Sequence, residues 1–288
     1  MLVAILQGLI SGALVGGMYA TVGIGLTLVF GVVRIVNFAH GSFLMAAAYA
    51  SWLMYERYGI DPYLSGLILV PSFFVLGVAY YWGLMRPMVG KSLLAQSLLT
   101  IAVGYVIDNT ALGLFSSQMR VVAVPYAVAS LSIGPIALPV TRLIAGGVGL
   151  CATTIMYLLL WRTGMGIAVR AAAADRPIAE AMGINTHSAQ AVVTGIGIAC
   201  AALGGVVLLP IFAASPSMGA DFTFLSFLII VLGGMGSFFG ALVGGVILGI
   251  TENLGATFFD GSTGHMLTFV LFVVLLVFRP YGVLVRRR

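Results

Sequence analysis

The feature that most constrains this sequence is a series of apolar runs that are long enough to cross a bilayer and contain almost no charge. A membrane-spanning helix needs about 20 mainly apolar residues. Runs of this kind occupy roughly residues 6–30, 42–56, 63–85, 93–113, 139–161, 187–211, 222–257 and 264–280. Only 7% of the residues are charged, whereas a soluble domain contains roughly 25%. The sequence therefore predicts an all-α, polytopic bundle of about eight transmembrane helices, folded as one domain over residues 1–288.

The run at 222–257 is too long for a single span, and glycines interrupt it. The interruption reads Gly233-Gly234-Met235-Gly236-Ser237-Phe238-Phe239-Gly240. Because glycine weakens helices and permits turns that other residues avoid, we expect two shorter helices with a break at membrane depth. The number of spans is then about eight or nine, depending on how this pair is counted.

A second interruption lies at residues 31–41, where polar residues separate two apolar helices. It contains Arg34, Asn37 and His40 and ends at Gly41. Irregular backbone at membrane depth persists only where protein or a water-filled cavity satisfies its polar groups. Two interpretations are open: a break that lines or gates a pathway, or an ordinary cytoplasmic loop in which His40 caps the next helix.

The two interruptions lie in opposite halves of the chain. Paired Gly-interrupted helices point to the central site of transporters that are built from repeated halves. For the second interruption, close packing between helices is the open alternative. The candidate pathway residues are Asn37, His40, Gly41, Gly233, Gly234, Gly236, Ser237 and Gly240.

Basic residues collect in alternate loops, which orients the chain by the positive-inside rule. The loops at 86–92 and 162–186 and the C-terminal tail hold most of them, so we place these three segments on the cytoplasmic side. Residues 114–138 then form an extracytoplasmic loop. Within it, the runs 121–124 and 131–133 flank a proline and predict a short hairpin or a pair of edge strands. The pattern leaves open the side on which the N-terminus lies.

The loop at 162–186 is the most polar internal segment. Asp175 is a good N-cap, Pro177 suits a first helical turn, and Gly183 suits a C-terminal cap. These residues predict a short, alanine-rich helix held between two spans. Such a helix would suit docking into a groove on a soluble partner, and a passive connector is the alternative.

Two acidic residues inside the apolar runs are each followed by an asparagine. They are Asp108 with Asn109 and Glu252 with Asn253. Because a charge in hydrocarbon costs about 3 kcal/mol, such residues face the protein interior, water or the membrane interface. Both pairs lie toward the outer ends of their runs, which favours the interface, and neither forms the acidic relay of an ion pump.

No catalytic or metal-binding constellation stands out in the sequence. Gly90-Lys91-Ser92 resembles the end of a phosphate-binding loop, but Met85 stands where that motif needs glycine. We therefore expect no nucleotide, no other cofactor and no metal to bind this chain, and we expect it not to be an enzyme.

Three segments in the correct order resemble the signatures of LivH-type permeases, which are subunits of the branched-chain amino acid ABC importers. They are Gly25 to Gly41, Arg170 to Asn185 and Val231 to Gly245, and the closing Arg279-Pro280-Tyr281-Gly282 also fits. The middle segment departs from the broader importer consensus, because Ala172-Ala173-Ala174 stands where Glu-Ala-Ala is expected.

The resemblance implies that the 162–186 loop couples the chain to ATPases. It assigns this role to Arg170, Asp175, Ala179, Glu180, Gly183, Ile184 and Asn185. It also implies an assembly with a sister permease subunit, two cytoplasmic ATPase subunits that bind ATP and Mg, and an extracytoplasmic substrate-binding protein. The membrane would be the inner or cell membrane of a bacterium or archaeon.

The substrate class that the resemblance implies is branched-chain or related amino acids. An importer of the same family for urea or short amides is one alternative. The other is a secondary transporter or channel that works alone, which would need Asp108 or Glu252 for ion coupling.

Overall fold

The computed structural model describes residues 1–258, 270 and 273. The run at 264–280, the closing Arg279 to Gly282 and the C-terminal tail, with the side of the membrane assigned to it, therefore lie outside the described residues. The elements are α1 (Leu2–Val33), α2 (His40–Tyr58), α3 (Pro62–Tyr80), η1 (Tyr81–Met85), η2 (Arg86–Met88), α4 (Leu93–Phe115), η3 (Pro125–Ala127), β1 (Ser130–Ile133), β2 (Ile136–Pro139), α5 (Val140–Arg162), α6 (Gly164–Ala174), α7 (Arg176–Ala181), α8 (Thr186–Leu208), α9 (Met218–Gly233) and α10 (Phe238–Phe258).

The predicted all-α, polytopic bundle is confirmed. Within the described part of the chain, 6 helical segments are long and apolar enough to cross a membrane. They are Leu2–Val33, Pro62–Met88, Leu93–Phe115, Val140–Arg162, Thr186–Leu208 and Phe238–Phe258. The run at 222–257 is divided into α9 and α10, as its glycines predict.

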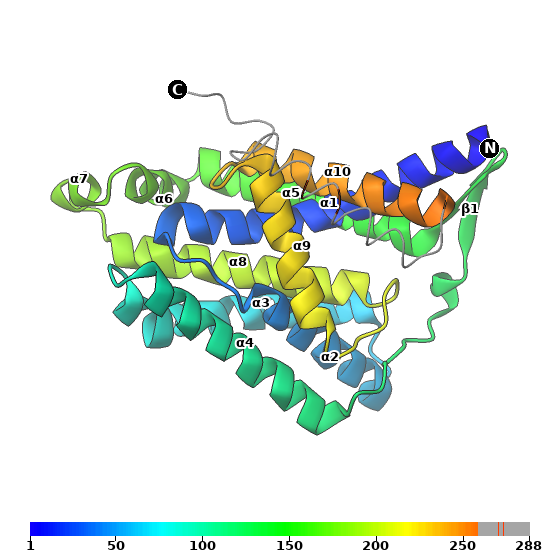
Figure 1. The fold of residues 1–288 in the computed structure, drawn as a ribbon, viewed down its shortest axis with the longest axis horizontal. Coiled ribbons are helices and arrows are strands. Elements are labelled where there is room, and N and C mark those ends of the chain that lie inside the picture. The colour runs from blue at the N-terminus through cyan, green and yellow to red at the C-terminus, as the bar shows by residue number, and fades with distance from the viewer. Residues whose placement is uncertain (259–269, 271–272, 274–288) are drawn as a thin grey trace.

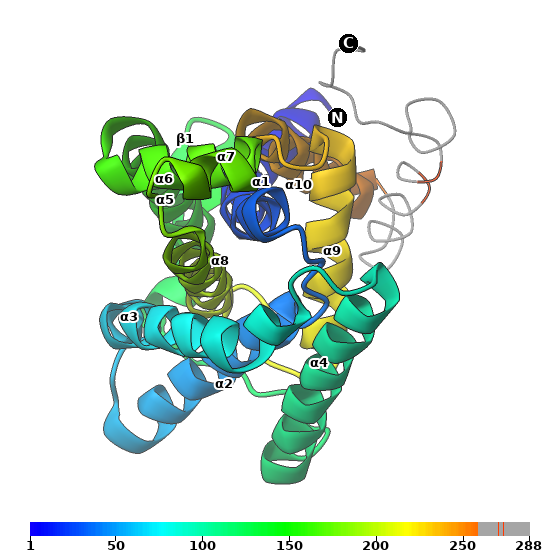
Figure 2. The same ribbon diagram turned by 90° about the vertical axis from the view of Figure 1, so that its left-hand side faces the viewer.

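Two helices, α1 and α8, form the centre of the bundle. In the most apolar stretch of each, 72% and 83% of the residues are buried, compared with 17% for α4. Helix α1 packs against α5, α8, α9 and α10, and α8 also packs against α2 and α3 (Figures 1 and 2). Small residues permit this packing: a side chain at Gly249 of α10 would overlap with the backbone of α1 at Gly16.

The loop at 114–138 contains a hairpin, but its strands differ from the expected pair. Strand β1 includes the predicted 131–133, and its antiparallel partner is β2 rather than 121–124. Gly134, with φ of 61°, takes the left-handed conformation that this tight turn needs. The pairing expected for 121–124 is therefore wrong, because a nearer segment closes the hairpin through a glycine turn.

Helices α6 and α7 lie at the opposite end of the bundle from β1 (Figure 1). The predicted capping of α7 is confirmed, since the Asp175 carboxylate accepts a hydrogen bond from the Ile178 N–H at 3.1 Å. Pro177 lies in the first turn, and Gly183 follows the helix with φ of 82°. Extended backbone at Asp175 separates α7 from α6. The sequence analysis did not predict α6 as a separate helix.

Candidate functional site

The first interruption is a true break inside the bundle. Helix α1 ends where Arg34 turns into the left-handed region with φ of 59°, and its N–H caps the Phe30 carbonyl at 3.0 Å. Helix α2 begins at His40, and both Asn37 and His40 are completely buried. The Nε2 atom of His40 lies 3.1 Å from the Val22 carbonyl oxygen and caps no helix. The interpretation as a loop capped by His40 is therefore wrong.

Side chains from neighbouring helices satisfy the backbone of this break. The Thr100 hydroxyl of α4 donates to the Val36 carbonyl at 3.0 Å. The Thr223 hydroxyl of α9 donates to the Phe38 carbonyl at 3.2 Å and accepts from the Gly41 N–H at 3.0 Å. Such substitute partners are the condition under which irregular backbone persists within a membrane.

Asn37 organises the middle of the same break. Its Oδ1 atom accepts hydrogen bonds from the Ala39 N–H at 3.2 Å and the Tyr80 hydroxyl at 3.4 Å. Among the described residues, the Nδ2 atom of Asn37 and the Nδ1 atom of His40 are buried with no hydrogen-bond partner. Two unused polar groups therefore lie at this break, where a change of conformation or a ligand could use them.

The second interruption is built differently, from glycine backbone. Gly234 and Gly236 have φ of 90° and 82°, and the Ser237 hydroxyl caps α10 by accepting from the Gly240 N–H at 3.0 Å. A side chain at Gly233 or Gly240 would overlap with the backbone of the other residue. The close-packing interpretation thus has direct support here, and left-handed turns are needed as well.

The two breaks lie side by side and share a cavity with α6. A Cβ atom placed on Gly31 would lie 3.5 Å from the Cα atom of Gly236. The cavity has a volume of about 750 Å³, and its lining includes Arg34 from the first break, Met235 from the second and Arg170 from α6. Figure 2 looks onto this end of the bundle. The structure thus joins all three segments that the sequence singled out.

Several predicted pathway residues lie away from this cavity. Asn37, His40 and Gly41 are buried between α2 and its neighbours, and Gly41 packs against Gly219 and Thr223 of α9. Gly233 and Gly240 form the crossing of α9 and α10 and do not line the cavity either.

The remaining coupling-loop residues lie around α7. Glu180 forms an ion pair with Arg176 at 2.8 Å and accepts a hydrogen bond from Thr186. Both hydrogen bonds lower the pKa of the Glu180 carboxyl, and the one from Thr186 has the larger effect. Ala179 is buried, and its carbonyl accepts from the Ile184 N–H at 3.0 Å.

Two other members of this loop have capping roles, at the starts of α7 and α8. Asp175 is the N-cap of α7. It also lines a neighbouring cavity of about 410 Å³ together with Arg34, Arg176 and Gln190. Asn185 caps α8 by accepting from the Ser188 N–H at 3.0 Å. The loop is therefore a compact, hydrogen-bonded unit joined directly to a central helix.

The polar pairs inside the spans have different surroundings. Asn109 is exposed and donates to the Tyr105 carbonyl of its own helix at 2.8 Å. Asp108 lies beside Ser42, where α4 meets α2, and its Oδ1 atom is buried with no hydrogen-bond partner among the described residues.

The second pair, Glu252 and Asn253, lies on α10. Glu252 is buried beside Tyr19 and Arg142, and Asn253 accepts from Arg142 at 2.6 Å. Glu252 therefore faces the protein interior, where it contacts Tyr19 of α1. The expected position of both pairs at the membrane interface stays a prediction.

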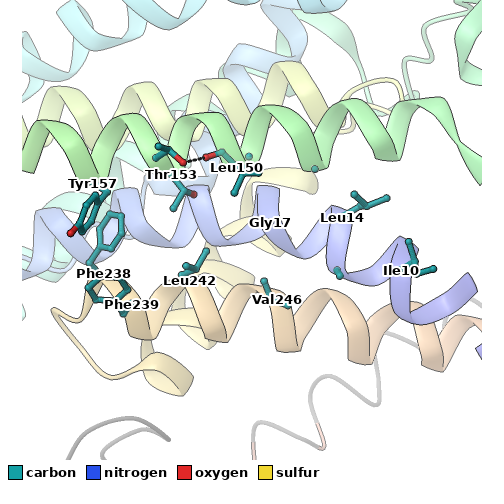
Figure 3. A pocket seen from close by; sticks show the side chains of 14 residues that line it. Ile10, Leu14, Gly17, Leu150, Thr153, Tyr157, Phe238, Phe239, Leu242 and Val246 are labelled. Atoms are coloured by element: carbon teal, nitrogen blue, oxygen red, sulfur yellow. Dashed lines mark hydrogen bonds between the residues drawn. The ribbon is translucent and has the colours of Figure 1, made fainter. Parts of the chain in front are cut away.

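A third cavity, of about 630 Å³, follows α1, α5 and α10 and is lined almost entirely by apolar side chains. Figure 3 shows Tyr157, Phe238 and Phe239 at one end of it and Ile10 and Leu14 at the other. No charged residue lines this groove. Among the described residues, no group of three or more His, Cys, Asp or Glu side chains could hold a metal ion.

Sequence reasoning missed several residues that form hydrogen bonds around the predicted positions. They are Tyr81, Thr100, Arg142, Gln190 and Thr223. A signal existed for Gln190, because it is a large polar residue in a helix that is otherwise mostly apolar. The threonines carried no such signal, since threonine is common in membrane helices.

Comparison with known proteins gives consistent matches. A family model described as the permease component of branched-chain amino acid transport systems matches residues 8–278. The high-affinity branched-chain amino acid transport permease protein LivH of Escherichia coli K12 is 30% identical, over 98% of this chain and 96% of its own length. The corresponding BraD of Pseudomonas aeruginosa is 29% identical over the same shares. A probable LivH of Methanocaldococcus jannaschii is 24% identical over 96% and 91%. No solved structure gives a significant match.

Proposed function

We propose, because this chain belongs to the family of permease components of branched-chain amino acid transport systems, that it forms part of the membrane pathway of an ATP-driven importer. The chain is a multi-pass membrane permease subunit. The proposed cargo is branched-chain or related amino acids, the cargo that the names of its relatives state for those proteins.

The observation that carries the proposed mechanism is the shared cavity. Both helix breaks and α6 line its walls, so a displacement of the α6–α7 segment would act on both breaks at once. A helix break is a natural hinge, because a few residues between rigid helices absorb the change in backbone angles. We therefore assign residues 162–186 to coupling and the two breaks to the pathway on which this coupling acts.

Helix α7 has the surface of a docking element. Ile178 of α7 and Met182, which directly follows the helix, are 62% and 78% exposed, and their spacing of four places both apolar side chains on one face. A groove on a soluble partner would cover them, in the way that grooves bind the apolar face of a helix. We propose two ATPase subunits as these partners, and ATP with Mg would bind there rather than on this chain.

The opposite end of the bundle would face the substrate-binding protein. The loop at 114–138 carries the hairpin of β1 and β2, and Arg120 pairs with Ala214, which ties this loop to the connection between α8 and α9. A sister permease would complete the pathway against helices that are largely exposed here, such as α4. The membrane would be the inner or cell membrane of a bacterium or archaeon, with α7 and the C-terminus on the cytoplasmic side.

Co-purification followed by reconstitution tests this proposal. The tagged chain is extracted in mild detergent, its partners are identified, and the complex is placed in liposomes with the binding protein. We expect two ATPase subunits, a second permease and leucine uptake that requires ATP. Uptake of urea or a short amide instead would redirect the substrate assignment.

Transport by the isolated chain would contradict the proposal. In that case an ion gradient alone would drive uptake, and Asp108→Asn or Glu252→Gln would abolish it. Asn109→Ala is a matched control, because the Asn109 side chain is exposed and bonds only its own helix.

A further inference from the structure

A row of hydrogen-bonded side chains crosses the interior from α7 to the end of α1. The Nη2 atom of Arg176 lies 3.2 Å from Nε2 of His187. The Nδ1 atom of His187 lies 2.8 Å from the Tyr81 hydroxyl. The Tyr81 hydroxyl lies 2.6 Å from Oε1 of Gln190, and Nε2 of Gln190 lies 3.4 Å from the Val32 carbonyl oxygen.

The chemistry of these groups gives the row a single direction. The Tyr81 hydroxyl has one proton, which it donates to the Gln190 carbonyl oxygen, so it must accept from His187. His187 then carries its proton on Nδ1, and its Nε2 lone pair accepts from Arg176. Each group therefore donates toward the centre of the bundle. If His187 were protonated, its Nε2–H would face an N–H of Arg176, and two donors would oppose each other.

Both ends of the row are attached to the segments that matter for transport. At the α7 end, Arg176 is held by its ion pair with Glu180. At the other end, Val32 is one of the last residues of α1, and its carbonyl is among those that a helix end leaves unpaired. The first break begins at Arg34, two residues after Val32.

The middle of the row is shielded from water. Tyr81 and Gln190 are 0% and 2% exposed, and Tyr81 begins the π-helical turn η1 that ends α3. The Thr194 hydroxyl, also on α8, donates to the backbone carbonyl of Gln190 at 2.8 Å. In such surroundings hydrogen bonds are strong and unpaired polar groups are costly, so the row resists separation.

We propose that Arg176, His187, Tyr81 and Gln190 are positioning residues that transmit the displacement of α7 to the break that follows α1. This inference rests on the proposed function, because it requires that α7 be the element that ATPases move. It adds that the movement reaches the break through side chains of η1 and α8, and not only through the backbone of α6.

The test uses the complete reconstituted transporter and measures substrate uptake and ATP hydrolysis together. Tyr81→Phe removes one hydroxyl and should lower the amount of substrate moved per ATP about tenfold, the effect of losing one buried hydrogen bond. ATP hydrolysis and the yield of the complex should persist. Tyr49→Phe is the matched control, because Tyr49 is equally buried and its hydroxyl has no hydrogen-bond partner among the described residues.

A second variant cuts the row at a less buried position, which guards against misfolding. His187→Leu should reduce coupling as much as Tyr81→Phe does, and the double variant should be no worse than either single variant, because a row broken once is already broken. Normal coupling in both single variants, or losses that multiply in the double variant, would overturn the inference. Absence of ATP-dependent uptake in the unmodified complex would instead count against the proposed function.

Discussion

The two helix breaks of this chain face the same cavity but are held by different forces. The break between α1 and α2 is held by side-chain hydrogen bonds from α3, α4 and α9, with Thr100 and Thr223 as donors. The break between α9 and α10 is held by direct backbone contact between Gly233 and Gly240. One break therefore consists of exchangeable polar contacts, and the other of a packing contact that leaves no room for a side chain.

This difference suggests a division of labour between the breaks. Hydrogen bonds can be exchanged for others at little net cost, because each contributes only about 1 kcal/mol. A contact between two backbones has no alternative partner, and separating it leaves a void that costs free energy in proportion to its volume. We infer that the first break moves during transport, while the second serves as a fixed crossing.

The largest effect is expected from Gly240→Ala, which tests the fixed crossing. The new methyl group would overlap with the carbonyl of Gly233, so α9 and α10 must separate. We expect a loss of about 3 kcal/mol or more in stability, the upper range for overpacked sites. The measurement is the melting temperature of the detergent-solubilised protein, followed by size-exclusion chromatography.

Gly147→Ala provides the control for this substitution. Gly147 lies in α5, and no heavy atom lies within 4 Å of a Cβ placed there. The Gly147→Ala variant should melt at or above the temperature of the unmodified protein, because alanine favours a helix by about 1 kcal/mol over glycine. Equal melting of the two variants would mean that the crossing is not a tight contact.

An intermediate effect is expected from Thr223→Val, which tests the polar break. Valine keeps the shape of threonine but leaves the Phe38 carbonyl and the Gly41 N–H without this partner. We expect a loss of about 2 kcal/mol in stability, because unpaired polar groups inside the protein are costly. Uptake by the reconstituted complex should fall with it, since the break loses its connection to α9.

Thr154→Val makes the same chemical change at an exposed site of α5, where the hydroxyl bonds only the Leu150 carbonyl of its own helix. Its stability should change by less than about 0.5 kcal/mol, as is usual for surface substitutions. A Thr223→Val protein as stable as this control would show that α9 does not hold the first break.

Much of this architecture was predictable from local signals. Long apolar runs gave the spans, glycines gave the division of 222–257, and the Asp175, Pro177 and Gly183 set gave α7. Each of these depends on residues that are close together in the chain. The hairpin partner was missed because 121–124 and 136–139 are both apolar, and only the turn at Gly134 distinguishes them.

The contacts that define the site were less accessible to sequence reasoning. Asn37 and His40 stood out because they are polar residues between apolar helices, but their neighbours could not be inferred. The Thr223 hydroxyl reaches a residue 185 positions away, and Arg142 reaches Asn253 across 111 positions. Such pairs follow from how helices are arranged around α1 and α8, which no periodicity in the sequence specifies.

The smallest effect is expected at Arg34, where the two breaks differ in backbone chemistry. The second break uses Gly234 and Gly236 for its left-handed turns, whereas the first uses an arginine with φ of 59°. A left-handed residue other than glycine costs roughly 1–2 kcal/mol, and glycine loses roughly 0.5–1 kcal/mol more on folding than other residues. Arg34→Gly should therefore stabilise the protein by about 0.5 kcal/mol. Arg34→Ala removes the same charge and keeps the strain, so it should not stabilise. If both variants melt at the same temperature, the strain at Arg34 is not relieved by glycine, and the two breaks differ only in their side chains.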